Sequence, residues 1–297
     1  MSCKTLARTK KDVVLGSGSF GVTVTKKYKG KQRAVKFVPR NEFDEEEAKL
    51  LAKIGKQRHI ASQVDYCVTE RTGIIIMEHM KGGSLTKDKG DNVTSPLYMG
   101  DEVPNLSVAK RVMLHLLQGL ADMHKNKIYH RDIKGDNIMV DRKPGRRLSW
   151  VVKYIDFGFA CQNLKASGRN PCQSCDTCGT DAYRPPEQYH NTLFKKDRKA
   201  RAADRRAETN DVWALGVTLL EFMSGQVMYI EDEYKVRRGV LRWNDEHPAR
   251  KYKVVDDSPK DQRKWDALFA IVEAMLCLDH NARLSAKEAL KRVKKVR

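Results

Sequence analysis

The sequence predicts an α+β protein with two lobes, a small β-rich lobe that carries one helix and a large, mainly helical lobe. Over roughly the first eighty residues, short β-branched or alternating runs are separated by glycine or basic turn residues. After Lys81-Gly82-Gly83 the apolar spacing changes to that of long helices. We therefore expect one lobe over residues 1–80, a glycine-containing hinge, and a second lobe over residues 81–297.

The composition is that of a folded protein. The 297 residues are 40% hydrophobic and 32% charged, which permits a packed core and argues against disorder. No apolar run reaches membrane-spanning length and Met1 to Lys4 lack a signal core, so we expect a soluble, intracellular protein without a transmembrane segment. Seven cysteines, an odd number, favour reduced thiols in the cytoplasm, nucleus or virion.

The charge balance is strongly basic. Lysine and arginine exceed aspartate and glutamate by 57 to 38, and a net charge of +19 attracts polyanions. Nucleic acid, acidic protein segments and an anionic membrane all fit this field, as does an ordinary enzyme with a basic surface. Charge alone does not identify the partner, although contact with nucleic acid is one prediction.

The predicted small lobe begins with three strands, over residues 13–15, 22–25 and 33–38. A helix follows over residues 42–54, with an acidic first turn and a cap at Asn41. Two more strands end at Met77. In the large lobe, residues 107–125 have one apolar face, whereas residues 211–223 are apolar almost all round and predict a buried central helix. The polar residues 86–107 predict an irregular segment.

A glycine-rich hairpin is predicted between the first two strands, at Gly16, Ser17, Gly18, Ser19, Phe20 and Gly21. The same glycine spacing opens a helix in dinucleotide-binding folds, but here strand-like residues follow. A glycine hairpin instead brings bare backbone N–H groups close to phosphate oxygens.

A lysine in the third strand, Lys36, follows Gly21 by fifteen residues, and this spacing favours a phosphate ligand over a snorkelling side chain. The next helix offers Glu45, Glu46 and Glu47 as partners. Only Glu47 stands three, four and seven residues before the apolar positions 50, 51 and 54. We expect Glu47 to pair with Lys36, and Glu45 and Glu46 to lie in solvent.

The strongest chemical signal runs from His130 to Asn137 and continues nineteen residues later with Asp156-Phe157-Gly158. Phosphoryl transfer requires an acceptor for the hydroxyl proton, cations near the phosphate oxygens and oxygen ligands for Mg²⁺. Asp132 is the candidate base and Lys134 a local cation. Asn137 and Asp156 are the candidate ligands for Mg²⁺, with Mn²⁺ as an alternative.

These motifs occur in the order found in the protein-kinase superfamily, which the chain resembles from about Val13 to Leu290. The resemblance implies a bilobal protein-kinase fold and an ATP-dependent protein kinase. Lys134 and the pair Gly179-Thr180 resemble serine/threonine kinases, so transfer of the γ-phosphate of MgATP to protein Ser or Thr is expected. The compact chain also resembles the minimal kinases of large DNA viruses.

The resemblance also assigns roles to single residues. Met77 resembles the residue at the back of the ATP pocket, and Glu78 and Met80 resemble the hinge residues that bind adenine through backbone carbonyl and amide. The resemblance also implies three sets of structural contacts. Leu51, His130 and Phe157 would belong to a hydrophobic spine. Glu187, the last residue of Pro185-Pro186-Glu187, would pair with Arg283, and Thr180 would contact Asp132 and Lys134 of the catalytic loop.

Two departures from the family pattern stand out. Thr23 replaces the valine that usually covers adenine. The span between Glu187 and Asp211 is unusually long and rich in lysine and arginine, notably over residues 195–206. We expect a surface insertion that helps to bind protein substrates, acidic or associated with nucleic acid.

Four cysteines cluster around the activation segment, at Cys161, Cys172, Cys175 and Cys178. Their spacing fits either a tetrahedral Zn²⁺ site or four ordinary reduced thiols.

Two rival functions would share parts of this pattern. A small-molecule phosphotransferase with a kinase-like fold generally lacks Pro-Pro-Glu followed by Asp-x-Trp-x-x-Gly, and both occur here. A basic scaffold with a degenerate kinase core would have lost Lys36, Asp132 or Asp156, and none is missing.

Overall fold

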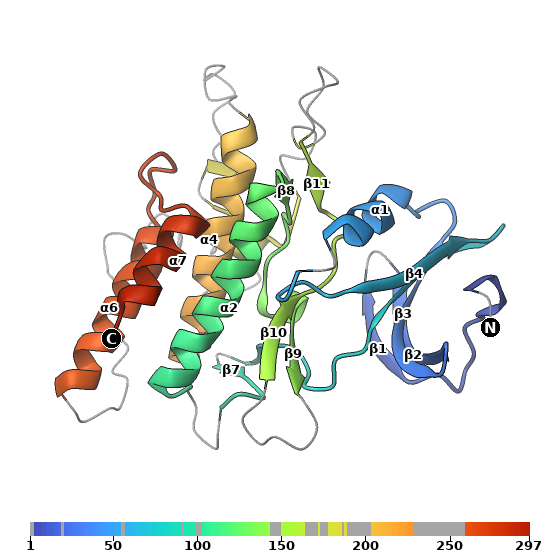
Figure 1. The fold of residues 1–297 in the computed structure, drawn as a ribbon, viewed down its shortest axis with the longest axis horizontal. Coiled ribbons are helices and arrows are strands. Elements are labelled where there is room, and N and C mark those ends of the chain that lie inside the picture. Colours follow the sequence, from blue (N-terminus) through green and yellow to red (C-terminus); the bar gives the residue numbers. More distant parts are fainter. Residues whose placement is uncertain are drawn as a thin grey trace.

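The computed structural model describes residues 3–18, 21–54, 57–90, 92–98, 103–142, 150–163, 172, 178–185, 187–188, 203–227 and 259–297. Figure 1 shows a β-sheet with helix α1 at one end of the molecule and the long helices α2, α4, α6 and α7 at the other. Short strand pairs lie between them. The predicted α+β arrangement of a β-rich lobe and a helical lobe is therefore confirmed.

The small lobe is built on an antiparallel sheet with the strand order β1-β2-β3-β5-β4. Its strands are β1 (Val14–Gly18), β2 (Gly21–Tyr28), β3 (Lys31–Pro39), β4 (Gln63–Val68) and β5 (Thr72–Glu78). Val35 and Phe37 belong to a buried cluster that Leu6 of the N-terminal segment also joins. Because side chains alternate along a strand, Lys36 points to the opposite face of β3, toward α1.

Helix α1 (Glu45–Ile54) buries Leu51 and Ile54, as the apolar stripe predicts. It begins three residues later than expected, and the cap is also different. Asp44, not Asn41, accepts a hydrogen bond from the Glu46 amide at 2.8 Å. The residues before Asp44 instead form a turn in which the Glu42 amide donates to the Pro39 carbonyl, so Asn41 lies outside the helix.

The described part of the large lobe contains the helices α2 (Leu106–Lys125), α4 (Ala203–Ser224), α6 (Pro259–Met275) and α7 (Ala286–Lys295). Helix α2 is capped by Asn105, whose side chain accepts from the Val108 amide at 3.0 Å. Helix α4 is buried at the centre of the lobe, with Trp213 and Leu215 fully enclosed. It begins eight residues before the predicted start, so the end of the expected insertion is helical. Residues 189–202 lie outside the described part of the chain.

Three short strand pairs and two 3₁₀ turns belong to the described part of this lobe, and a further 3₁₀ turn at the N-terminus packs on β4 of the small lobe. The pairs are β6 (Lys87–Lys89) with β7 (Asn92–Thr94), β8 (Ile128–Tyr129) with β11 (Cys161–Gln162), and β9 (Ile138–Arg142) with β10 (Trp150–Tyr154); the 3₁₀ turns are η1 (Cys3–Thr5), η2 (Gly135–Asn137) and η5 (Asp181–Tyr183). The β6–β7 pair occupies a segment predicted to be irregular. Strands of three residues are too short to produce a recognisable alternation. The pair is anchored because the Val93 amide donates to the Gly225 carbonyl at the end of α4.

Disulfides contradict the expectation of reduced thiols. Cys3 is bonded to Cys67 and Cys161 to Cys172, and Cys178 is disulfide-bonded as well. Cys277 is the free thiol among the described cysteines. Neither alternative for the activation-segment cysteines, a Zn²⁺ site or four reduced thiols, fits the described residues, because Cys161, Cys172 and Cys178 are disulfide-bonded. Across the described residues no other cluster suited to a metal ion is found either.

None of the described helices combines the length and apolar character needed to cross a bilayer.

Candidate active site

A buried lysine joins the two lobes. Lys36 Nζ lies 2.9 Å from Glu47 Oε1 on α1 and 2.9 Å from Asp156 Oδ1, which follows β10. Burial alone would lower the pKa of Lys36, but the two carboxylates outweigh it and raise that pKa. Lys36 is therefore a fixed cation at physiological pH, held between an N-lobe helix and the Asp156 segment.

The pKa values of the two carboxylates beside Lys36 are shifted in opposite directions. Burial raises the pKa of Glu47, and Lys36 only partly offsets this. Asp156 also loses hydration, but Lys36 more than compensates and lowers the pKa of Asp156. Asp156 is thus kept as a carboxylate, which is the form able to bind a cation. Glu45 and Glu46 are partners of Lys49 on the outer side of the helix.

The catalytic-loop aspartate, Asp132, is buried and held from several directions. Its Oδ1 accepts hydrogen bonds from the Thr180 amide at 2.9 Å and the Thr180 hydroxyl at 2.8 Å. Its Oδ2 accepts from Asn137 Nδ2 at 2.8 Å, and Lys134 Nζ lies 3.8 Å away. Lys134 also donates to Thr180 Oγ1 at 2.7 Å. The expected contacts of Thr180 with Asp132 and Lys134 are present.

Two oxygen-bearing side chains lie beside this loop. Asn137 uses its amide nitrogen to bind Asp132, which leaves its side-chain oxygen as the atom available to a cation. The Ile155 amide donates to the Asn137 carbonyl at 2.9 Å, so Asn137 and Asp156 are held side by side. A neutral and an anionic oxygen donor fit Mg²⁺, which binds hard oxygen ligands.

The catalytic loop is anchored to the buried helix α4 by Asp211. This side chain accepts from the His130 amide at 2.9 Å and the Arg131 amide at 2.8 Å, and lies 3.0 Å from His124 Nε2. Arg131 adopts φ 65° and Asp156 φ 57°, a left-handed conformation that non-glycine residues rarely take. Sequence reasoning matched Asp211 to a helix motif but gave it no role. An acidic residue at the start of the largely apolar run over residues 212–220 was the signal.

A close approach of two segments fixes Thr180. Gly179 has φ 89°, and a Cβ at this position would lie 2.4 Å from the Arg131 carbonyl oxygen. Only glycine permits this approach. It brings the Thr180 amide within reach of Asp132, so the activation segment and the catalytic loop share one hydrogen-bonded unit.

The glycine-rich hairpin spans β1 and β2, which pair from Val14 to Gly18 on one strand. Gly16, Ser17, Gly18 and Gly21 are described, whereas Ser19 and Phe20 lie outside the described residues. Thr23 is directly opposite Lys36 in the β2–β3 register, so both side chains share the face that carries the lysine. The described base of the hairpin is therefore joined directly to the strand that carries Lys36.

The segment that leaves β5 toward the large lobe contains Glu78 and Met80. The Glu78 carboxylate accepts from the Ser62 amide at 2.7 Å and from Lys153 Nζ at 2.7 Å. Because the Glu78 side chain is engaged by these two partners, the backbone of Glu78 is the part of the residue that remains available to a nucleotide. Met80 is buried.

Two of the three expected spine residues, Leu51 and Phe157, lie in one core cluster, and the third, His130, is fully buried next to Phe157. The rings of His130 and Phe157 are 4.8 Å apart between centroids, and His130 Nε2 is 3.0 Å from the Ile155 carbonyl oxygen. Leu51 of α1 belongs to the same cluster. Side chains from both lobes therefore pack around Phe157, next to Asp156.

The expected arginine–glutamate pair is confirmed. Arg283 forms two hydrogen bonds with Glu187, Nη1 to Oε1 at 2.7 Å and Nη2 to Oε2 at 3.1 Å. Its guanidinium also lies 4.8 Å from the Trp213 ring and donates to the Cys277 carbonyl. A buried, bidentate pair thus ties the segment after Thr180 to the centre of the helical lobe.

Comparisons with known proteins identify relatives of this arrangement. The sequence profile described as protein kinase domain matches residues 9–293. Serine/threonine-protein kinase CLA4 of Candida albicans is 28% identical over 242 residues, which cover 81% of this chain and 21% of that protein. Mitogen-activated protein kinase kinase kinase 15 of Mus musculus is 31% identical over 229 residues, covering 74% and 15%.

A third relative, calcium-dependent protein kinase 4 of Plasmodium falciparum, is 24% identical over 295 residues, covering 93% of this chain and 47% of that protein. The chain thus spans less than half the length of these curated relatives.

Proposed function

The chain belongs to the protein kinase family, and from this we propose that it transfers the γ-phosphate of ATP to serine or threonine hydroxyls of proteins. One observation carries the proposal. Lys36 is buried and paired at 2.9 Å with both Glu47 and Asp156, the arrangement that an active nucleotide site requires. A core without catalytic function could replace this buried ion group by apolar residues with little or no loss of stability, so the presence of the group favours a functional site.

Asp132 is the proposed general base. It accepts the proton of the substrate hydroxyl as the oxygen attacks phosphorus. Thr180 and Asn137 hold its two carboxylate oxygens, which fixes the direction of the acceptor lone pairs. Lys134 adds positive charge within 3.8 Å of that carboxylate and stabilises the negative charge that develops on the transferred group.

The nucleotide is proposed to lie between the glycine-rich hairpin and the catalytic loop. Backbone amides of residues 16–21 face the phosphates, Lys36 binds phosphate oxygens, and the backbone of Glu78 and Met80 binds adenine. Asn137 and Asp156 would hold Mg²⁺, or Mn²⁺ in its place. When bound, this cation would neutralise part of the negative charge on the phosphate oxygens. The lobes of this enzyme are proposed to be residues 1–80 and 81–297.

Its protein substrates are proposed to be acidic or associated with nucleic acid. The net charge of +19 supports this, because complementary charge increases the rate of encounter.

The test is phosphate transfer from labelled ATP to peptide libraries that contain only Ser, Thr or Tyr as acceptor. We expect transfer to Ser and Thr, and loss of transfer in Asp132→Asn. Asp266→Asn, the same change on an exposed face of α6, is the matched control and should remain active. Transfer to tyrosine alone, or full activity in Asp132→Asn, would refute the proposal.

A further inference from the structure

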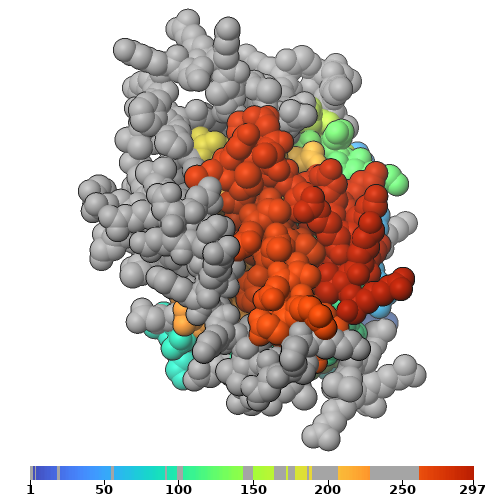
Figure 2. Space-filling view, turned by 90° about the vertical axis from the view of Figure 1, so that its left-hand side faces the viewer, coloured from blue at the N-terminus to red at the C-terminus, as the bar shows by residue number. Residues whose placement is uncertain are grey.

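The last helix of the chain presents a row of cations to solvent. The apolar side of α7, with Ala289, Leu290 and Val293, is buried in the core of the large lobe. The opposite side and the residues after the helix form the α7 basic surface, which consists of Lys287, Lys291, Arg292, Lys294, Lys295 and Arg297, all exposed. Figure 2 shows α6 and α7, in orange and red, side by side on one face of the molecule.

In the described part of the chain, no carboxylate lies at salt-bridge distance from any member of the α7 basic surface. The one acidic residue between Lys287 and Arg297 is Glu288. Its carboxylate accepts from the amide and hydroxyl of Ser285 in a capping box, and these bonds lower its pKa. Arg292 interacts with it only through longer-range attraction.

The surface is held in a fixed position. The capping box fixes the start of α7, and its apolar side packs on α2. Beyond the helix, Lys110 of α2 donates to the carbonyl of Val296. Lys287, Lys291 and Lys295 are each separated by four residues, so they lie on one side of the helix, about 6 Å apart along its axis. Because the helix is already held in place, binding at this surface costs little further backbone entropy.

We propose that the α7 basic surface binds the phosphate backbone of nucleic acid. Duplex DNA carries about one charge per 1.7 Å of its axis, so a row of cations along a helix faces several phosphates at once. A membrane fits less well, because interfacial helices insert an apolar face and that of α7 is turned to the core. The uniform sign of the surface matches a polyanion rather than a protein partner of mixed charge.

Binding at this surface leaves the catalytic loop uncovered. Helix α2 lies between α7 and the strands β8 and β10, of which β8 leads into the catalytic loop and β10 leads to Asp156. Nucleic acid bound on α7 therefore tethers the enzyme without blocking Asp132. The binding itself does not depend on the proposed kinase activity.

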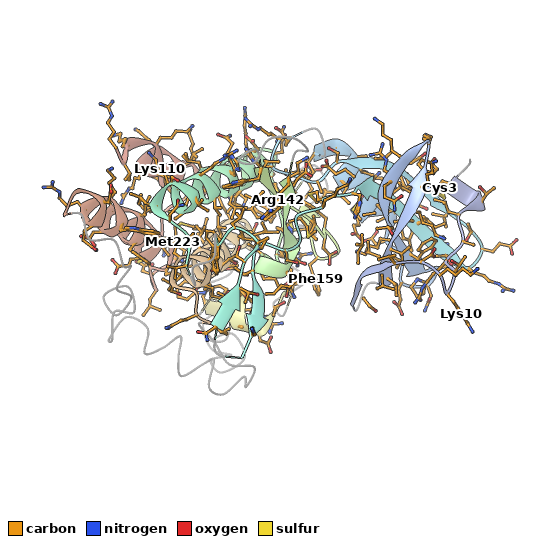
Figure 3. The ribbon with its side chains drawn as sticks, turned by 90° about the horizontal axis from the view of Figure 1, so that it is seen from below. Cys3, Lys10, Lys110, Arg142, Phe159 and Met223 are labelled. Carbon is orange, nitrogen blue, oxygen red and sulfur yellow. A yellow bond between two sulfur atoms is a disulfide. The ribbon has the colours of Figure 1, made fainter. Side chains whose placement is uncertain are left out.

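The test is the affinity for a fluorescently labelled duplex DNA of mixed sequence, measured by anisotropy across about 50 to 200 mM salt. The variant replaces Lys287, Lys291 and Lys295 by Ala. The matched control replaces Lys10, Lys27 and Lys31, which are also exposed, and removes the same total charge. Figure 3 shows Lys10 at the opposite end of the molecule from Lys110, which touches the end of α7.

We expect the α7 variant to bind DNA at least tenfold more weakly near 0.1 M salt, and its salt slope to fall by about 2 to 3, since each phosphate contact contributes roughly 0.9. The control should change neither quantity by more than a small factor, and both variants should phosphorylate free peptide like the parent. Absence of DNA binding by the parent, or equal weakening in both variants, would overturn the proposal. So would a loss of binding to phosphatidylserine vesicles with unchanged DNA affinity.

Discussion

Asp211 accepts a 2.8 Å hydrogen bond from the backbone amide of Arg131, the residue that precedes the proposed base. One partner lies in the buried helix α4 and the other in the catalytic loop, where it has φ 65°. An unfavourable backbone conformation persists only where surrounding contacts hold it. The geometry of Asp132 is therefore fixed from the core of the large lobe rather than by the loop sequence alone.

Replacing this anchor should damage both stability and catalysis. Asp211→Asn removes the negative charge that receives two backbone amides, and we expect a loss of about 2–4 kcal/mol in the free energy of unfolding. The catalytic-loop backbone should relax, so kcat should fall while ATP affinity changes little. Urea denaturation and calorimetric ATP binding measure the two effects. A variant with parental kcat would show that the loop keeps its conformation without Asp211.

The proposed base and the proposed metal ligand should fail in different ways. Asp132→Asn should lower kcat by ~10²-fold or more and leave ATP binding largely intact. Asp156→Ala should remove the metal dependence of ATP binding together with activity, because it deletes the anionic donor beside Lys36. ATP titrations with and without Mg²⁺ separate the two. Identical defects in both variants would contradict the assigned roles.

The buried pair of Arg283 and Glu187 should contribute measurably to folding. Removing either partner leaves the other charge without its bidentate contact, so Arg283→Met and Glu187→Gln should each cost about 2–4 kcal/mol of stability. The double variant should cost less than the sum of the two. A double-mutant cycle from urea denaturation gives the coupling energy, and strict additivity would mean that the pair contributes nothing beyond its separate contacts.

Acid should destabilise the large lobe through His115. Burial, together with the nearby charges of His59, Arg111 and Arg58, lowers the pKa of His115 to about 3. The unfolded chain binds a proton below its ordinary pKa of 6.5, whereas the folded chain does not until about 3, so stability falls as pH falls through that window. Because the ring is partly accessible, the slope from this residue should stay below about 1.4 kcal/mol per pH unit.

The check compares unfolding free energies of the parent and His115→Gln at about pH 7 and pH 5. The parent should lose more stability than the variant over this interval. His59 stacks on His115 at 4.4 Å and also has a lowered pKa, so part of the dependence should remain in the variant. Equal losses in both proteins would exclude His115 as a source.

The disulfides should be visible by peptide mapping without reduction. Linked peptides should contain Cys3 with Cys67 and Cys161 with Cys172, and Cys277 should be alkylated. The Cys3–Cys67 bond closes a separation of 64 residues, so Cys67→Ala should cost about 4 kcal/mol by loss of the loop constraint on the unfolded chain. Full alkylation of all seven thiols in the native protein would contradict the pairing.

The sequence by itself determined the lobes, the long helices and the identity of the residues that meet around Lys36. Local signals suffice for these, because apolar periodicity, glycine spacing and motif order are all contained in short windows. The choice of Glu47 over its two neighbours also followed from helical periodicity. It placed the one glutamate on the side of the buried stripe.

Only the tertiary structure decided which distant groups hold the site together. Asp211 lies about eighty residues from the amides that it binds, and Cys161 bonds Cys172 instead of joining a metal site. Asp44 rather than Asn41 caps α1, because the turn closed by the Glu42 amide and the Pro39 carbonyl leaves Asn41 outside the helix. The six cations of the α7 basic surface lie together on one exposed side because the other side of that helix is buried. Such pairings depend on how elements pack, and packing is set by contacts between residues far apart in the chain, which no local pattern encodes.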